Sequence, residues 1–566
     1  MIRKNRLLAI LVCVALVITS CKKIDIEKIS TEKLEKPEEA KPEYGGEISL
    51  PLVGLSTLNP LLSKNESYYY FNKLIYESMF EFDENLDIVE KLAESYSLEE
   101  NGRIVNIRLR DDVFWHDGQK LKAEDVIFTI EAIKSLGLSS SYGSLINQAL
   151  GGLDRINLSS VIEAEGSGRE LRIIFDRVYG NNLEALTFPI IPAHVFSNIK
   201  EALAKDDYRL LGTGPYKFKS YRKSKELILE RNEDYRGGRP YLEKVVGRIM
   251  ASEEDAIRAF ETGQINAAVM EGTDWEKYGK SNRMKLIEFA TPNYEFLGFN
   301  FSRDIFAGPS GVHLRKAIAH AIDRDSIVGK VYLGHGVKAD LPIHPDSWLN
   351  KAGSYEYDLK LANEEMKKAG YSLKDGEGFY LDDKQERLKL RLLTNSLNPM
   401  RFGSSDIIRR NLKELGLELE LVPENPNLAN TSSEEFDSQW NLVQGELARG
   451  NFDLVLAGWQ QSIIPDPSFM FHTRNLGSSN FIRYSNETTD RLLEEAFYAG
   501  QSREDKLRAY EKLEKNLMSM MPYASICYTH KALLIDRQYY GEANPSFSDP
   551  YRGLDRIFTL EDSKNE

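Results

Sequence analysis

The stretch LKLRLLTNSLNPMRFGSSDIIRRNLKELGLELELV, residues 388–422, has the pattern of a strand, a helix and a second strand. Leucines alternate with polar residues at both ends of the stretch, which is the spacing of half-buried strands. Between them Ile408, Leu412 and Leu415 recur at helical spacing, and Gly416 follows as a typical helix stop. This β-α-β pattern predicts an α/β fold.

A second β-α-β pattern lies earlier in the chain. Residues 245–250 and 265–270 are predicted strands, and residues 254–262 are a predicted helix that Gly263 closes. Two separated β-α-β regions imply two α/β lobes with a cleft between them. Between these pieces and the amino terminus, residues 82–186 mix short strands and helices and predict an additional α+β subdomain.

The best candidate for a ligand contact follows a short apolar run at residues 452–457. That run predicts a strand buried on both faces. Ligand sites in open α/β sheets lie at the carboxyl ends of strands, and Gly458 and Trp459 stand at such an end. The indole of Trp459 offers a flat apolar wall and a hydrogen-bond donor.

The amino terminus predicts export and a membrane anchor. Residues 1–20 have a basic start, an apolar run and small residues at the end, which together describe a signal peptide. The run is shorter than the about 20 apolar residues that span a bilayer. The ending VITSC resembles a bacterial lipobox, which implies cleavage before Cys21 and acylation (diacylglycerol and palmitate) of that residue. Residues 21–43 are rich in Lys and Glu and predict a solvated tether.

Composition bounds the remaining possibilities. The chain has 566 residues, too many for one core of typical size, and a formal net charge of −14, which argues against nucleic acid as a partner. Once Cys13 leaves with the signal peptide and Cys21 is acylated, Cys527 stands alone, so an internal disulfide is excluded. The histidines are scattered without metal-ligand spacing, and hydrolase motifs are missing, so neither an enzyme, a metal nor a cofactor is predicted.

Six motifs in order resemble one known family. They are Leu58–Pro60 with Ile75–Met79, Leu92–Tyr96, Ile107–Gly118 (IRLRDDVFWHDG) with Ala123–Val126, Gly212–Tyr216, Leu314–Ile318 with Ala321–Arg324, and Gly458–Trp459 with Pro465–Ser468. The series is similar to the extracellular solute-binding proteins of family 5, the oligopeptide- and dipeptide-binding components of ABC importers. The resemblance runs over nearly the whole mature chain.

The resemblance implies a two-lobed, type II periplasmic-binding-protein-like fold with a third domain and a hinge. Lobe I is expected to take residues 44–81, 187–285 and 530–566, the extra subdomain residues 82–186, and lobe II residues 286–529. The hinge is then expected where the chain passes from one lobe to the other, near residues 285 and 530.

The implied function is capture of oligopeptides in the cleft by a monomeric receptor. The receptor is expected on the outer face of the cell membrane, or on the periplasmic side in a two-membrane host, where it delivers its ligand to ABC permease subunits. Alternatives left open are a nickel chelate, an opine or an oligosaccharide as cargo, and a signalling or chaperone lipoprotein.

Five residues are candidates for ligand binding: Trp459, Asp466, Asn59, Asn300 and Tyr69. The sequence also departs from the family pattern, in which an acidic residue shortly after Gly-Trp pairs with the ligand's α-ammonium. Here residues 460–464 are QQSII, and the first carboxylate is that of Asp466. Recognition of a free peptide amino terminus is therefore an open question, and the ligand is bound by backbone alone, is N-blocked, or is not a peptide.

Overall fold

The computed structural model describes residues 41–150, 158–163, 168–205, 208–272, 275–351, 353–422, 433–499 and 502–560. Cys21, the predicted signal peptide and most of the predicted tether lie outside these residues. The last two tether residues belong to the folded body, because β1 (Pro42–Glu43) pairs with β19 (Thr559–Leu560). Within the described residues no helix is both long and apolar enough to cross a membrane.

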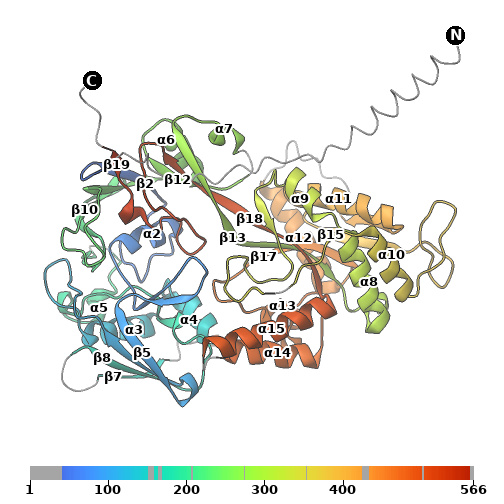
Figure 1. Cartoon of the computed structure of the whole chain (residues 1–566), viewed down its shortest axis with the longest axis horizontal. Coiled ribbons are helices and arrows are strands. Elements are labelled where there is room, and N and C mark those ends of the chain that lie inside the picture. The colour runs from blue at the N-terminus through green and yellow to red at the C-terminus, as the bar shows by residue number, and fades with distance from the viewer. Residues whose placement is uncertain are drawn as a thin grey trace, which may run out of the picture. The chain divides into compact units, whose positions relative to one another are not determined.

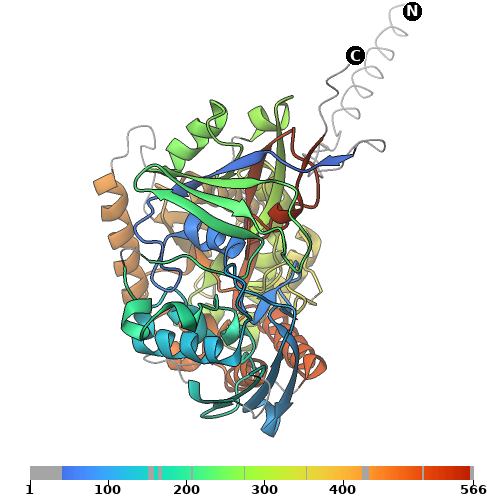
Figure 2. The same cartoon turned by 90° about the vertical axis from the view of Figure 1, so that its left-hand side faces the viewer.

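A four-stranded sheet carries the amino-terminal part of the fold (Figures 1 and 2). Its order is β2 (Glu47–Val53), β11 (Lys244–Met250), β10 (Glu226–Arg231) and β9 (Tyr216–Arg222). The first two strands are parallel, although almost two hundred residues separate them. Alternate side chains of β2, those of Ile48, Leu50 and Leu52, are fully buried.

The first predicted β-α-β unit is divided between two sheets. Helix α6 (Glu253–Glu261) does follow β11 and begins at a cap in which Ser252 accepts a hydrogen bond from the Asp255 N–H. The next strand, β12 (Ala267–Met270), pairs with β18 of another sheet and not with β11. The two strands of this unit therefore belong to different sheets, because local periodicity does not determine which strand becomes the partner.

The largest sheet has the order β12, β18 (Tyr523–Asp536), β13 (Met284–Phe299), β17 (Leu454–Gln460), β15 (Lys389–Thr394) and β16 (Glu418–Val422), with β14 (Gly336–Lys338) beside β18. The second predicted β-α-β unit is confirmed here. β15 and β16 are parallel neighbours, and α11 (Pro399–Leu415) joins them and ends at Gly416 in a left-handed conformation. β17 lies inside the sheet between β13 and β15, as its apolar sequence predicts.

Two long antiparallel strands, β13 and β18, run side by side through this sheet (Figure 1). Their register runs from Met284 opposite Asp536 to Gly298 opposite Tyr523, with an irregularity between Ala290 and Tyr294. The predicted chain crossings near 285 and 530 fall on these two strands. The irregularity is a natural place for bending, because a bulge interrupts the ladder.

A third sheet lies within residues 82–186, in the order β5 (Ala93–Glu99), β6 (Ile104–Leu109), β8 (Glu170–Phe175) and β7 (Leu158–Glu163). Helices α3 (Ala123–Leu136) and α4 (Gly143–Leu150) lie between β6 and β7 in the sequence. The small pair β3 (Phe80–Phe82) and β4 (Ile88–Glu90) precedes them. Strands together with helices agree with the α+β character predicted from the sequence.

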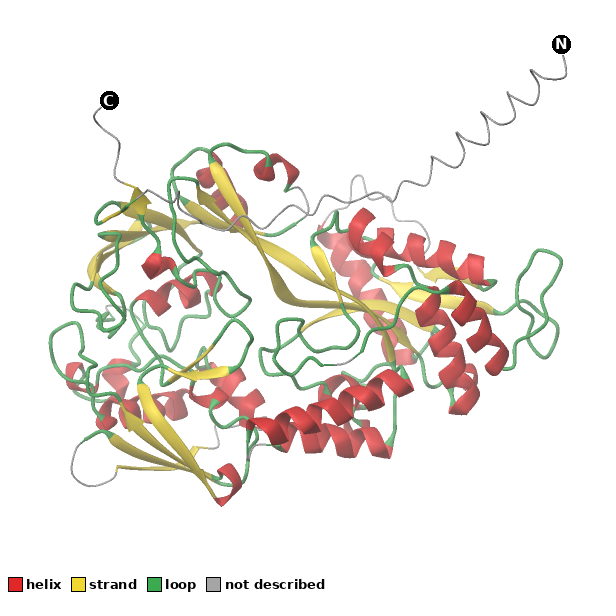
Figure 3. Ribbon diagram, in the orientation of Figure 1, coloured by secondary structure: helices red, strands yellow, loops and turns green. Residues whose placement is uncertain are grey.

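The remaining helices lie mainly between residues 308 and 520, and Figure 3 shows them beside the strands. They are α8 (Gly308–Ala321), α9 (Arg324–Lys330), α10 (Leu359–Lys368), α12 (Ser433–Arg449), α13 (Ser468–Phe471), α14 (Glu487–Tyr498) and α15 (Arg503–Met520). Short helices elsewhere are α2 (Glu66–Phe71), α5 (Ile199–Ala202) and α7 (Glu276–Gly279).

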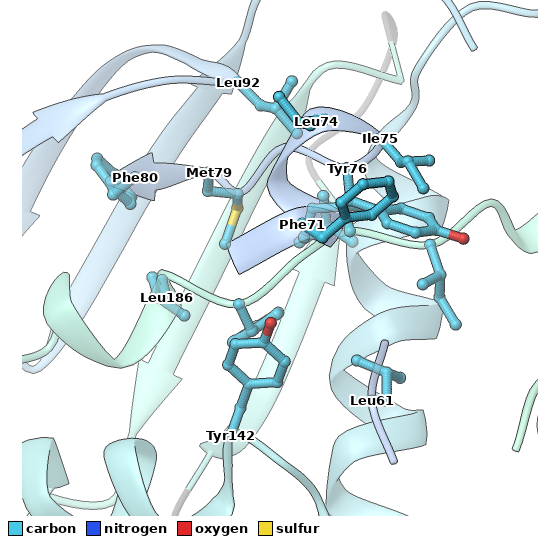
Figure 4. Close-up of a cluster of buried hydrophobic side chains, with 14 of the residues drawn as sticks. Leu61, Phe71, Leu74, Ile75, Tyr76, Met79, Phe80, Leu92, Tyr142 and Leu186 are labelled. Atoms are coloured by element: carbon cyan, nitrogen blue, oxygen red, sulfur yellow. The ribbon is translucent and has the colours of Figure 1, made fainter. Parts of the chain in front are cut away.

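One apolar cluster joins the first sheet to the 82–186 region. Phe71 and Ile75 from α2 and the segment after it, Leu61, Tyr142 and Leu186 are all buried members of this cluster, as Figure 4 shows. Burial of side chains of this size contributes about 1.5–3 kcal/mol each. The cluster therefore fixes α2 and Tyr142, which belong to the candidate site described next.

Candidate functional site

A cavity of about 540 Å³ lies between segments that are far apart in the sequence. α2 and the turn after it, α4 with the residues before it, the loop after β17, and the tail near residues 547–555 all line it. Six tyrosines contribute to its wall: Tyr69, Tyr70, Tyr76, Tyr142, Tyr235 and Tyr551. We call it the tyrosine cavity.

The predicted residue Tyr69 lines the tyrosine cavity. Its ring centroid lies 5.3 Å from that of Tyr70 and 5.7 Å from that of Tyr142. α2 presents the rings of Tyr69 and Tyr70 because Asn65 caps the helix by accepting a hydrogen bond from the Tyr68 N–H, whereas Tyr142 directly precedes α4. Tyr69 is thus placed where it can contact a ligand, and its contact with one stays a prediction.

A second cavity of about 400 Å³ adjoins the first, because Gln460 lines both. Its wall includes Trp459, His335 and His530, and we call it the histidine cavity. It lies over the strand ladder, since β13, β17 and β18 each contribute residues to it. The two cavities therefore meet at Gln460, at the end of β17, and we refer to them together as the tract.

An ion pair in the wall of the histidine cavity explains the glycine before Trp459. Arg401 Nε and Nη2 donate to the two carboxylate oxygens of Glu295 at 3.0 and 2.9 Å, a bidentate geometry. A Cβ atom on Gly458 would lie 2.3 Å from Glu295 Oε1 and 2.7 Å from Arg401 Nη2. The glycine leaves room for the ion pair, which crosses directly over the strand, and a Cβ there would force the pair to shift.

Trp459 lines the histidine cavity and is partly buried. Its indole N–H donates to the Tyr523 hydroxyl at 3.4 Å. Its ring centroid lies 5.1 Å from that of Phe469 and 5.4 Å from that of Phe481. The indole therefore has a packing role as well as a face on the cavity. Ligand contact by Trp459 stays a prediction that this position permits.

A buried carboxylate is held between the two histidines that name this cavity. Glu288 Oε1 lies 3.3 Å from His335 Nδ1, and Glu288 Oε2 lies 3.0 Å from His530 Nδ1. Burial alone raises the pKa of Glu288, but the hydrogen bonds from His335 and His530 outweigh it and hold that pKa below its ordinary value. The ring centroid of Trp275 lies 4.0 Å from that of His335.

Asn59, predicted as a ligand contact, is fully buried and lies outside the lining of both cavities. Its Nδ2 donates to the carbonyl oxygens of Ala202 and Ala204, both at 2.9 Å. Its Oδ1 accepts from the Leu61 N–H at 3.0 Å. The side chain joins two backbone segments, and this arrangement leaves its amide donors engaged.

Asn300 and Asp466 also lie outside the lining of both cavities. Asn300 is fully buried and donates from Nδ2 to the carbonyl oxygens of Gly450 and Phe452 at 3.0 and 2.7 Å. Asp466 accepts from the Ser468 N–H at 3.0 Å, as a turn residue does. Of the five predicted residues, only Tyr69 and Trp459 reach the tract.

Sequence reasoning missed the charged residues of the tyrosine cavity. Lys73 follows α2, and its Nζ donates to the Ser548 carbonyl at 2.7 Å, next to Asp549 in the tail. Residues 547–555 have no periodic pattern, and no sequence signal places them against α2. Among the described residues, no group of three or more His, Cys, Asp or Glu side chains is arranged to hold a metal ion.

Comparisons with known proteins agree with this architecture. The model of bacterial extracellular solute-binding proteins, family 5, matches residues 87–481. The oligopeptide-binding protein AppA of Bacillus subtilis is 26% identical over 552 residues, covering 94% of this chain and 95% of that protein. The heme-binding protein A of Haemophilus influenzae is 22% identical and covers 83% of this chain and 84% of its own length.

Solved structures share the fold. AppA of Bacillus subtilis in complex with a nonapeptide has a TM-score of 0.56 at 24% identity, covering 92% of this chain and all of that one. NikZ of Campylobacter jejuni in complex with Ni(L-His) has a TM-score of 0.61 at 21% identity, covering 91% of this chain and 99% of NikZ. The fold is thus that of the type II binding proteins, with two lobes, a third domain and a hinge. This chain belongs to the bacterial extracellular solute-binding proteins of family 5.

Proposed function

We propose that this chain is the lipid-anchored, monomeric receptor of an ABC importer and that it captures oligopeptides. The observation that carries the proposal is the pair of neighbouring cavities that share Gln460 in their walls. A tract of this form suits an extended chain, which offers backbone groups for hydrogen bonds and places its side chains in pockets. The resemblance to AppA, which was solved with a nonapeptide, supports a ligand of this kind.

Capture is proposed to occur by closure of the two lobes. The domain bounds given above remain part of the proposal, with residues 82–186 as the extra subdomain. In the present structure this region already touches residues of lobe II: Ser462 Oγ donates to Gln148, and Arg503 Nε donates to Asp87 at 2.7 Å. A ligand that touches both sides favours the closed form by its difference in affinity for the two forms.

Native mass spectrometry of the full chain in detergent tests the cargo. We expect added masses that fragment as peptides of mixed sequence. A single non-peptide species, such as a nickel chelate, an opine or an oligosaccharide, would contradict the peptide proposal and leave the binding-protein role standing. Soaking the purified chain with a synthetic nonapeptide mixture before the measurement covers the case in which a weak ligand is lost during purification.

The anchor has its own test. We expect the amino-terminal peptide of the mature protein to begin at an acylated Cys21 and the protein to sediment with membranes. Cys21→Ser is expected to remove the acyl chains on which stable anchoring depends. The protein is then released from the membrane, or it keeps an uncleaved signal peptide. Substitution of the buried Cys527 by Ala is the matched control and leaves membrane association unchanged.

A further inference from the structure

The carboxylates of the tyrosine cavity are already engaged. Glu77, whose side chain is 2% exposed, accepts from Arg236 Nη2 at 2.7 Å. It also accepts from Thr213 Oγ1 at 2.9 Å and from the Tyr235 hydroxyl at 3.0 Å. A carboxylate with three such donors has little capacity left for a ligand ammonium group.

The other three carboxylates of the lining each lie within 4.0 Å of a basic side chain. The pairs are Glu81 with Lys91 at 3.3 Å, Asp549 with Lys73 at 3.8 Å, and Asp555 with Arg556 at 3.4 Å. Burial raises the pKa of Asp549 and of Asp555, and the neighbouring cations lower it by less. Burial therefore disfavours the ionised form of these two carboxyl groups.

Lys73 is the basic residue of this wall that lies against the aromatic rings, and Lys91 and Arg552 also line the cavity. The Nζ of Lys73 lies 5.3 Å from the ring centroid of Tyr69 and 5.8 Å from that of Tyr70. The cation is held there by the rings and by the Ser548 carbonyl. A ligand ammonium that enters against Tyr69 meets a like charge, whereas a carbonyl oxygen meets a donor.

The loop after Trp459 contributes neutral groups to the same cavity. Gln460, Gln461, Ser462 and Ile463 all line it. Gln461 accepts from the Tyr528 hydroxyl through Oε1 at 2.9 Å, while its Nε2 is buried and has no hydrogen-bond partner among the described residues. A buried donor without a partner costs free energy, and a ligand carbonyl would satisfy it.

We propose that the tyrosine cavity accepts the uncharged, acylated amino end of an oligopeptide and discriminates against a free α-ammonium. This inference rests on the proposed function and names the class of peptide that the same tract takes. The acyl carbonyl accepts from Gln461 Nε2 or Lys73 Nζ, and the acyl group packs on Tyr69 and Tyr142. The peptide then continues past Gln460 into the histidine cavity.

The test is a competition on the full chain in detergent. A library of random nonapeptides is split, half is N-acetylated, the halves are mixed, and the bound fraction is extracted and weighed by mass spectrometry. We expect the acetylated form to be enriched about tenfold or more over the free amine, the size expected when a charged group loses its hydrogen-bonding partners. Equal recovery of the two forms, or enrichment of the free amine, overturns the inference while leaving peptide capture intact.

One variant is expected to invert the preference for the acylated peptide over the free amine. Ser462→Asp places a carboxylate on the cavity wall, so enrichment is expected to shift toward the free amine by about tenfold. Ser462→Asn is the matched neutral variant: it removes the hydroxyl without adding a charge, so the difference between the two variants reports the carboxylate, and circular dichroism checks that both are folded. An unchanged ratio in Ser462→Asp contradicts the proposed position of the peptide's amino end. Recovery of neither peptide form by the native protein overturns the proposed function and this inference together.

Discussion

The two cavities differ in how they are built. The histidine cavity lies over the β13, β17 and β18 ladder, and its central ion pair, Glu295 with Arg401, crosses a strand at Gly458. The tyrosine cavity is assembled from α2, α4, a loop and the tail, which meet only through tertiary packing. The first cavity is a part of the sheet, whereas the second depends on how separate segments come together. We therefore expect changes in the first to affect stability and changes in the second to affect selection of the ligand.

The largest effect is expected from Arg401→Ala. It leaves Glu295 as a mostly buried carboxylate without its bidentate partner, at 12% side-chain exposure. We expect a loss of about 2–3 kcal/mol in the free energy of unfolding, toward the lower end for such pairs because both side chains retain some solvent contact. Urea unfolding followed by circular dichroism measures it. The double variant Glu295→Gln with Arg401→Met is expected to recover most of this loss. If it recovers none, the loss comes from missing packing and not from the unpaired charge of Glu295.

Gly458→Ala acts on the same ion pair with a smaller expected effect. The new Cβ lies too close to Glu295 Oε1, so the pair or the strand must shift, at about 1–2 kcal/mol of unfolding free energy. Gly376→Ala is the matched control, because a Cβ at Gly376 meets no atom within 4 Å. The effect of Gly458→Ala is expected to shrink in the Arg401→Ala background, and full additivity would contradict the proposed clash.

This difference in construction also explains what the sequence could predict. Trp459 was found because a strand end can be located from an apolar run, and the end of a strand in an α/β sheet faces a ligand site. Tyr69 is predicted only because the resemblance places its segment where lobe I approaches the cleft, and no local signal indicates its contact partners. Lys73 and Asp549 could not be found, because their proximity joins segments almost five hundred residues apart.

The positions of the two predicted asparagines have a related cause. The sequence predicts Asn300 as an amide for a ligand backbone, and the resemblance places Asn59 near the cleft, whereas the structure uses both amides to join backbone segments. Polar groups that are buried must find partners, and nearby carbonyls supply them. The pairing of β12 with β18 likewise depends on partners and not on local structure. Local elements follow from periodicity, whereas long-range pairing depends on the whole chain.

The two cavities are also expected to differ in how they contribute to binding of the peptide. Tyr69→Ala and Trp459→Ala are each expected to weaken binding of an N-acetylated nonapeptide about tenfold, because each removes an aromatic wall. Isothermal titration calorimetry measures the effect, and Tyr69→Phe and Trp459→Phe are controls that keep a ring. With peptides shortened at the amino end, the effect of Tyr69→Ala is expected to disappear while that of Trp459→Ala remains. The opposite pattern would place the peptide in the reverse direction.

The smallest expected effect is a pH dependence carried by Glu288. Its folded-state pKa is lowered below the ordinary value by His335 and His530, which outweigh its burial. A carboxyl group of this kind contributes stability that is fully present above its unfolded-state pKa of about 4.3 and is lost as the pH falls through the folded-state value. Glu288→Gln is therefore expected to lower stability at pH 7 and to flatten the acid side of the stability curve.

Urea unfolding at a series of pH values from 7 down to 3 compares the native protein with Glu288→Gln. Glu364→Gln, a change at an exposed position of α10, is the control and should keep the native slope. Equal slopes for Glu288→Gln and the native protein would mean that the histidine contacts contribute nothing to folding. A flatter slope would show that the histidine cavity holds its own charges in place, and such charges are then unavailable to a ligand. The peptide would bind there through aromatic and backbone contacts, with selection for charge confined to the tyrosine cavity.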